Sequence, residues 1–221
     1  VIINSGQANA CTGDEGLANC RRTREMLSRE TNAAPEEILP ASTGVIGEQL
    51  RMDLWEKAVP PLCAALGNSG MEDFARAIMT TDSFPKCTGR VITLSGGEVT
   101  LAAAAKGAGM ICPNMATMLS LVLCDAEVDR ADWQDMFRRA VDRTFNRVSV
   151  DGDTSTNDTV YGLANGASAV AAKGEDLALL EEAVTEVLSE LAYMLVQDGE
   201  GATKVMHITV SGAADDADAE K

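Results

Sequence analysis

The chain has 221 residues, of which 46% are apolar and 4% aromatic, so we expect one main domain over residues 1–221 with a core of aliphatic side chains. Asp and Glu number 34 against 18 Lys and Arg, and a formal net charge of -16 argues against binding to nucleic acid or to an anionic membrane. The sequence contains neither a basic and apolar leader nor an apolar run of the about 20 residues that cross a membrane.

The first half of the chain predicts an opening strand followed mainly by helices. The first residues, VIINSG, are strand-like, and because there is no initiator Met we expect that an N-terminal part precedes them. Apolar residues recur at helical spacing in three later segments, and Thr12 or Asp14 can cap the first of these. We predict helices at 14–30, 48–59 and 71–82, and a short strand at 36–47 that runs into Ser-Thr-Gly.

The second half mixes both types of element. Two β-rich runs around Ser95-Gly96-Gly97 predict a hairpin over 89–107. We predict further strands at 117–127, 147–150 and 204–212, and helices at 129–146 and 174–197. Because one strand pair is an adjacent antiparallel hairpin, the pattern favours an α/β or α+β layered domain over a purely parallel doubly wound sheet.

Several common catalytic and metal-binding patterns are missing from the sequence. His207 is the only histidine and lies in a predicted strand, so a Ser-His-Asp or Cys-His mechanism is disfavoured. The chain has no G-x-S-x-G, P-loop or G-x-G-x-x-G motif. The six cysteines match no zinc spacing, and we expect them to be reduced residues of a cytoplasmic protein: Cys11, Cys20, Cys63, Cys87, Cys112 and Cys124.

The segment DGDTSTND at 151–158 resembles the start of a calcium loop. The sixth position of such a loop is Gly and the twelfth is a bidentate Glu, but these positions hold Thr156 and Gly162. We therefore interpret the segment as a turn stabilised by its own polar side chains, and we predict no metal site.

Thr117 raises a question of its own, because it follows the glycine-rich KGAGMICPNMA and opens an apolar run. It is either the first residue of a buried strand or a nucleophile. Without a histidine base, a threonine can use its own α-amine, which requires cleavage of the Ala116–Thr117 bond. The small side chain of Ala116 leaves room for the hydroxyl to attack the preceding carbonyl.

Other residues offer supporting chemistry, each with a simpler alternative. Thr43 and Gly44 offer a hydroxyl and an unobstructed N–H for an oxyanion hole, or they form an ordinary strand-to-helix turn. Lys106 can bind a carboxylate or face the solvent from its glycine turn. Glu200 can hold an ammonium group or belong to a turn that ends a helix.

Six stretches in order carry a resemblance to one family. The chain resembles the ornithine acetyltransferases, also called bifunctional glutamate N-acetyltransferases, of arginine biosynthesis. The stretches are NSGQANACTG (4–13), ASTGVIG (41–47), TTDSFPK (80–86), KGAGMICPNMATM (106–118), DGDTSTND (151–158) and DGEGATK (198–204).

The resemblance implies a mechanism and a set of site residues. A precursor cleaves itself at Ala116–Thr117, and Thr117 then carries acetyl from N-acetylornithine to glutamate in a ping-pong reaction. Thr43 and Gly44 match the oxyanion pair. The substrate-binding positions are Thr117, Lys106, Glu200 and one of Thr80 and Thr81, whose assignment stays open.

The resemblance also implies a four-layer αββα fold like that of N-terminal-nucleophile hydrolases, with a distinct connectivity. It implies no metal and no tightly held cofactor, two cleaved chains that associate as α2β2, and longer chains at both ends. Use of acetyl-CoA as a substrate remains open. The alternatives are a related aminopeptidase or amidase that passes the acyl group to water, and a non-catalytic relative that keeps the fold.

Overall fold

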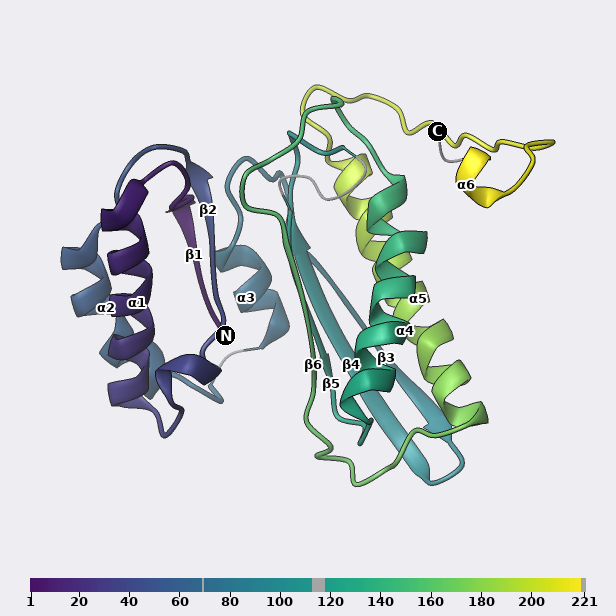
Figure 1. Ribbon diagram of the computed structural model, residues 1–221, viewed down its shortest axis with the longest axis horizontal. Coiled ribbons are helices and arrows are strands. Elements are labelled where there is room, and N and C mark those ends of the chain that lie inside the picture. Colours follow the sequence, from purple (N-terminus) through teal and green to yellow (C-terminus); the bar gives the residue numbers. More distant parts are fainter. Residues whose placement is uncertain (69, 113–117, 220–221) are drawn as a thin grey trace.

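The computed structural model describes residues 1–68, 70–112 and 118–219. Figure 1 shows helices, a small sheet, a larger sheet and a second pair of helices side by side, which is the layer order α-β-β-α. The short helix α3 (Met71–Ala77) lies between the two sheets. Both the mixed α/β class and the predicted order of the layers are therefore confirmed.

The first layer pair comes from the N-terminal third of the chain. Strands β1 (Ile2–Gln7) and β2 (Pro40–Val45) are parallel neighbours. Helices α1 (Gly13–Glu30) and α2 (Met52–Ala64) pack beside them around Ile2, Met26, Ile38 and Val59. The predicted helix at 14–30 is confirmed, and Thr12 is its N-cap residue, although its hydroxyl donates to Asn9 Oδ1 instead of capping the helix.

The larger sheet has the strand order β3-β4-β5-β6 in the described residues. Its hairpin of β3 (Lys86–Leu94) and β4 (Gly97–Lys106) is antiparallel around Ser95 and Gly96, as predicted. Strand β5 (Leu119–Cys124) pairs antiparallel with β4 and parallel with β6 (Thr159–Ala164). The chain crosses from β5 to β6 through a helix, which is the usual connection between parallel strands.

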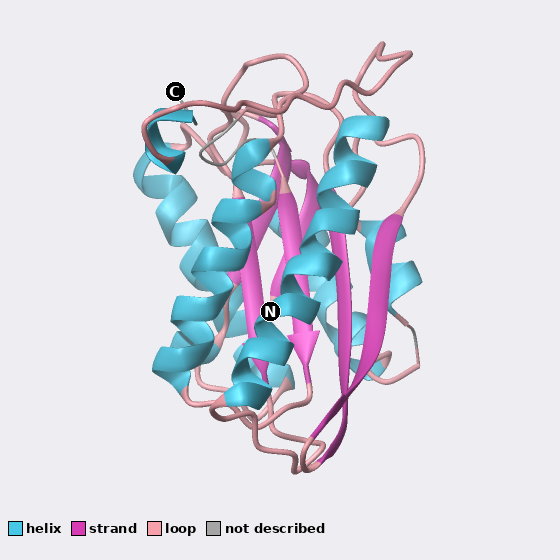
Figure 2. Cartoon of the chain, turned by 90° about the vertical axis from the view of Figure 1, so that its right-hand side faces the viewer, coloured by secondary structure: helices cyan, strands magenta, loops and turns pink. Residues whose placement is uncertain are grey.

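Two helices cover one face of this sheet, and Figure 2 shows them in front of the strands. They are α4 (Arg130–Arg143), capped by the Asp129 carboxylate, and α5 (Glu175–Gln197). Their apolar faces form the main core with the inner side chains of β4 and β5. The core is built largely from Ala, Val and Leu, as the low aromatic content indicated, with Met136, Leu188 and Leu191 fully buried.

Two predicted strands are wrong, and one strand was missed. Residues 147–150 are not a strand, because Val150 N–H and the Ser149 hydroxyl both donate to the carbonyl of Ile111. Residues 204–212 pair with no strand in the described part of the chain, and Ile208 is 80% exposed there. The missed strand is β6, whose pattern is interrupted by Gly162. That glycine makes room for the ring of Phe137, since a Cβ would lie 2.7 Å from it.

Other elements differ from the predictions at their ends. Helix α3 stops at Ala77, before the Thr-Thr-Asp that was expected to close it. Thr43 and Gly44 lie inside β2, so they do not form a strand-to-helix turn. His207 lies outside any strand and stacks on the ring of Tyr193. The six cysteines are free thiols, and no described helix has the length and apolarity to span a membrane.

Gly44 on β2 pairs with Gly6 on β1. Gly44 has φ +130°, and a Cβ there would lie 2.3 Å from the carbonyl carbon of Gly6. Gly44→Ala should therefore lower the free energy of unfolding by about 2–4 kcal/mol, from overpacking and backbone strain together. Chemical denaturation measures this loss. Gly47→Ala is the matched control, because Gly47 also has positive φ but has no atom within 4 Å of its Cβ position. Equal losses in the two variants would contradict the proposed clash.

Candidate active site

An open pocket of about 730 Å³ lies between the small sheet, the end of β4 and the loop that follows α5. The segments that line it are far apart in the sequence. Among its lining residues are Thr43, Gly44, Thr80, Thr81, Lys106 and Glu200. The structure thus brings together every described residue that the sequence analysis singled out as catalytic or substrate-binding.

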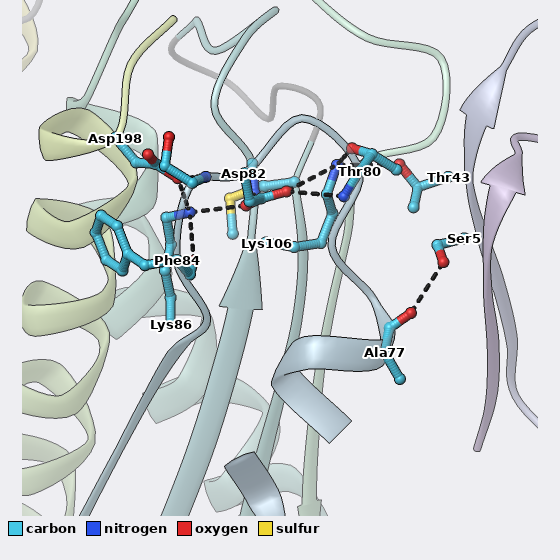
Figure 3. Close-up of polar contacts among 12 residues, drawn as sticks. Ser5, Thr43, Ala77, Thr80, Asp82, Phe84, Lys86, Lys106 and Asp198 are labelled. Carbon is cyan, nitrogen blue, oxygen red and sulfur yellow. Dashed lines mark hydrogen bonds and ion pairs between the residues drawn. The ribbon is translucent and has the colours of Figure 1, made fainter. Parts of the chain in front are cut away.

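Lys106, the last residue of β4, occupies the back of the pocket and is only 2% exposed. Its ammonium group donates to the hydroxyl of Thr80 at 2.7 Å and to the hydroxyl of Thr43 at 3.3 Å (Figure 3). The nearest carboxylate oxygen of Asp82 is 3.9 Å away. Burial lowers the pKa of the Lys106 amine, and the charge of Asp82 opposes this shift.

Thr43 and Gly44 reach the pocket from β2, which pairs with β1 along its whole length. The Thr43 side chain is almost fully buried and accepts the hydrogen bond from Lys106. The hydroxyl of Ser5 on β1 donates to the carbonyl of Ala77 at 2.9 Å and so connects the small sheet to α3. This contact fixes the small sheet beside the segment that contains Thr80 (Figure 3).

The choice between Thr80 and Thr81 has a geometric basis in this arrangement. Both residues follow α3 and line the pocket. Of these two threonines, only Thr80 has a hydroxyl that contacts Lys106 among the interactions of the described residues.

Glu200 also lines the pocket, from the glycine-containing loop after α5. Its backbone N–H donates to the carbonyl of Ala108 at 2.7 Å. Its carboxyl group lies against Gly109, where a Cβ would be 3.0 Å from the carboxyl carbon. The absence of a side chain at Gly109 therefore leaves the space that this carboxylate occupies.

The loop 151–158 binds backbone N–H groups of a neighbouring segment. The two carboxylate oxygens of Asp151 accept from Met110 N at 2.5 Å and from Ile111 N at 3.0 Å. Asp158 accepts from Met118 N at 2.8 Å. In the described residues no group of three or more His, Cys, Asp or Glu side chains has a metal-binding arrangement. The turn is thus an anchor for the chain that follows Lys106.

Asp158 is the most perturbed carboxyl group of this region. Burial raises its pKa to about 6, against the opposing effects of the Met118 N–H and of Lys106. Its Oδ2 atom is buried and has no hydrogen-bond partner in the described residues. Buried, unpaired carboxylates are costly and are typical of functional sites.

Thr117 and Ala116 lie outside the described residues, so the expected nucleophile and cleavage point have no geometry here. The adjacent residue, Met118, is described and is the one whose N–H binds Asp158.

A buried ionic cluster that the sequence did not indicate lies behind the pocket and is formed by Asp82, Lys86 and Asp198. The Lys86 ammonium lies 2.7 Å from Asp82 and 2.6 Å from Asp198. All three residues were inside quoted motifs, TTDSFPK and DGEGATK. The available signal was the presence of charged residues next to apolar ones in both motifs, but nothing in the sequence places the two motifs together.

Comparisons with known proteins identify relatives of the chain. A family model described as the ArgJ family matches residues 1–221. The chain is 67% identical over 220 residues to "Arginine biosynthesis bifunctional protein ArgJ" of Nitratidesulfovibrio vulgaris, covering 100% of this chain and 56% of the relative. It is 49% identical over 225 residues to the protein of the same name from Geobacter sulfurreducens, covering 100% of this chain and 57% of that one. The chain thus spans a little over half the length of these relatives.

A solved structure also resembles part of the chain. It is a crystal structure of arginine biosynthesis bifunctional protein argJ from Bacillus halodurans, with 36% sequence identity. The match covers 52% of this chain and 61% of that one, with a TM-score of 0.46. A score of that size does not by itself define the fold.

The raised pKa of Asp158 predicts a pH-dependent effect of its removal. Between about pH 4, the ordinary pKa of an aspartate, and pH 6, the folded chain holds a proton that the unfolded chain releases, so its stability falls as the pH rises. Asp158→Asn cannot ionise and keeps an acceptor for Met118 N. It should stabilise the protein by about 1–2 kcal/mol at pH 7.5 and by little at pH 4.

Thermal denaturation across this pH range measures the effect. Asp153→Asn, at an exposed position of the same loop, controls for the simple loss of one negative charge. A gain for Asp158→Asn that matches this control, or that does not change with pH, would refute the interpretation.

Proposed function

The chain belongs to the ArgJ family, and on this premise we propose that the protein transfers an acetyl group from N-acetylornithine to glutamate in arginine biosynthesis. The observation that carries the proposal is the convergence of Thr43, Gly44, Thr80, Lys106 and Glu200 on one pocket. These residues come from four separate segments, and we assign Thr43, Gly44 and Lys106 to the acyl-transfer step and Glu200 to substrate binding.

In this proposal Thr117 is the nucleophile and is generated by self-cleavage. Its hydroxyl attacks the carbonyl carbon of Ala116, the acyl group moves from nitrogen to oxygen, and water releases the N-terminal fragment. The freed α-amine of Thr117 then accepts the hydroxyl proton as the base of the mature site. A base of this kind explains how the site works without a nearby histidine. The sequence neighbour of Thr117, Met118, is held by Asp158 beside the start of β6.

Acyl transfer next requires groups that stabilise the negative oxygen of the tetrahedral intermediate. The Thr43 hydroxyl and the Gly44 N–H are our candidates, and the missing side chain at Gly44 lets a substrate approach the backbone. Lys106 contacts the Thr43 oxygen, which brings a positive charge to this side of the pocket. We therefore assign Lys106 to the acyl-transfer step in preference to binding a substrate carboxylate.

The negative charge of Glu200 in the pocket favours N-acetylornithine as the acetyl donor. N-acetylornithine carries a free δ-ammonium group, and the Glu200 carboxylate is placed to pair with it. The acetyl group moves from one amine to another of similar basicity, so the exchange needs neither ATP, nor a metal, nor a bound cofactor. Small molecules are therefore the expected substrates.

The proposal also covers a second activity, the assembly of the cleaved chains and their location in the cell. The relatives are named bifunctional, which supports a second activity, and transfer from acetyl-CoA to glutamate is our candidate for it. We expect the two products of cleavage to remain associated as α2β2 in the cytoplasm.

The first test is the chemical state of the Ala116–Thr117 bond. Intact mass and N-terminal sequencing should find two fragments, one beginning TMLSLV, because the α-amine must be free to act as base. Thr117→Ala should stay uncut and inactive, whereas Thr117→Ser should retain cleavage and a reduced activity. An uncut protein that transfers acetyl to glutamate would refute this mechanism, and acetyl release that is unaffected by glutamate would indicate an amidase.

Steady-state kinetics separates the two charged residues. Glu200→Gln should raise KM for N-acetylornithine about tenfold with a smaller effect on kcat, because it weakens binding of the ammonium group. Lys106→Met should lower kcat about 10²-fold with little change in KM, because its charge is needed most in the transition state. Lys57→Met removes an exposed lysine of α2 and should match the wild type. A change in KM alone for Lys106→Met would assign it to substrate binding instead.

A further inference from the structure

Asp82 lies at the centre of the polar contacts behind the pocket, although it is not itself a lining residue (Figure 3). Its carboxylate accepts from Lys86 Nζ and from Gly107 N, both at 2.7 Å, and from Thr80 N at 3.1 Å. Its Oδ2 atom faces Lys106 at 3.9 Å. One buried carboxylate thus contacts the two chain segments that deliver Lys106 and Thr80 to the pocket.

Lys86 balances this carboxylate from the side away from the pocket. Its side chain is fully buried at the start of β3 and is shared between Asp82 and Asp198. Asp198 also accepts from Ser83 N at 2.9 Å. The two lysines and two aspartates form a cluster with no net formal charge, which lowers the cost of burying each of them.

A buried ionic cluster is not an efficient source of stability, since apolar residues of the same size often replace such groups without loss. Its contacts suggest a different use. Three of the four groups around Asp82 belong to Lys106 or to its immediate surroundings, because Gly107 is the next residue and Thr80 accepts a hydrogen bond from Lys106.

The contact between Lys106 and Thr43 determines how the Thr43 hydroxyl is used. A hydroxyl has one hydrogen and two lone pairs. Lys106 occupies a lone pair of the Thr43 oxygen, so the hydroxyl hydrogen must find another acceptor. The pocket that Thr43 lines provides room for one, and an oxyanion is an acceptor of this kind.

We propose that Asp82 is a positioning residue for the acyl transfer, which holds Lys106 against Thr43 so that the Thr43 hydroxyl directs its hydrogen into the pocket. The inference rests on the function proposed above and adds a residue that does not touch the substrate. Asp82 fixes Lys106 in two ways. It accepts from the backbone N–H groups of Gly107, the residue after Lys106, and of Thr80, whose hydroxyl contacts Lys106. It also places a negative charge beside the Lys106 ammonium group.

The electrostatics of Lys106 makes this role measurable. Burial and the positive charge of Lys86 lower the pKa of the Lys106 amine, whereas the negative charges of Asp82, Glu200 and Asp158 raise it. Removing the charge of Asp82 should therefore lower the pKa of Lys106 further. Removing the charge of Asp198 should affect the pKa of Lys106 little, because Asp198 pairs with Lys86 and is not among the charged groups that shift that pKa.

The matched pair of variants is Asp82→Asn and Asp198→Asn. Each removes one buried carboxylate partner of Lys86, so each should destabilise the fold to a similar degree. Only Asp82→Asn also alters the contacts of Thr80, Gly107 and Lys106. Asp82→Asn should lower kcat for acetyl transfer at least tenfold with KM within about twofold, and Asp198→Asn should keep kcat within about threefold. Equal losses of kcat would overturn the proposal in favour of a structural role.

Two further measurements strengthen the test. In a double-mutant cycle, Asp82→Asn should have little additional effect on kcat in a Lys106→Met background, because both changes disable one arrangement. Additive losses would overturn the proposal. If Asp82→Asn does not fold, Asp82→Glu retains the partner charge of Lys86 and displaces the carboxylate from Thr80 and Gly107. It should lower kcat at least fivefold, and unchanged kinetics would count against positioning.

A direct titration separates failure of this inference from failure of the proposed function. The chain has six lysines, so NMR of protein labelled at the lysine side chains can follow each of them against pH, with Lys106→Met assigning the signal. The Lys106 midpoint should fall in Asp82→Asn and stay unchanged in Asp198→Asn. No fall in Asp82→Asn would overturn the role of Asp82. A fall together with a wild-type protein that transfers no acetyl group would overturn the acetyltransferase assignment instead.

Discussion

The pocket depends on the neutralisation of two lysines buried in a low-dielectric interior. An unpaired ammonium group in that environment would cost several kcal/mol or lose its proton. Asp82 and Asp198 prevent this for Lys86, and Asp82 also faces Lys106. Because these four residues come from the loop after α3, the ends of β3 and β4, and the end of α5, their pairing also fixes the segments that surround the pocket.

A second set of carboxylates fixes the opposite end of the same region. Asp151 and Asp158 are the first and last residues of the loop 151–158, and they accept from the backbone N–H groups of Met110, Ile111 and Met118. In the loop that resembled a calcium site, these acidic side chains therefore bind backbone N–H groups of the chain itself. Asp158 is half-buried, and this burial raises its pKa. Its ionised form therefore lowers the stability of the fold beside the candidate active site.

The pocket offers both a positive and a negative group, and both suit the proposed reaction. Lys106 is buried beside Thr43, where the proposed mechanism places the negative charge of the acyl-transfer intermediate. Glu200 is exposed in the loop after α5, where it can meet a cationic substrate group. A chain with a net charge of -16 thus keeps a positive group at one deep position, by surrounding it with hydroxyl groups and a shared carboxylate.

The sequence by itself determined the amphipathic helices, the β3–β4 hairpin, the mixed α/β class and, through the six motifs, the residues that line the pocket. Hydrophobic periodicity and the glycines of the hairpin turn are local signals, so they can be read without a partner. The αββα layer order came from the family resemblance and agrees with the structure.

Tertiary structure alone decided the rest, because those features depend on contacts between distant segments. Strand β6 needs β5 beside it and Phe137 over Gly162, whereas residues 204–212 have the alternation of a strand but no paired neighbour in the described chain. Asp82 and Asp198 are 116 positions apart, and only the fold brings both to Lys86. In a sequence, a surface charge cannot be told from a buried charge until its partners are known. The sequence therefore revealed the pocket residues but not the ionic cluster behind them.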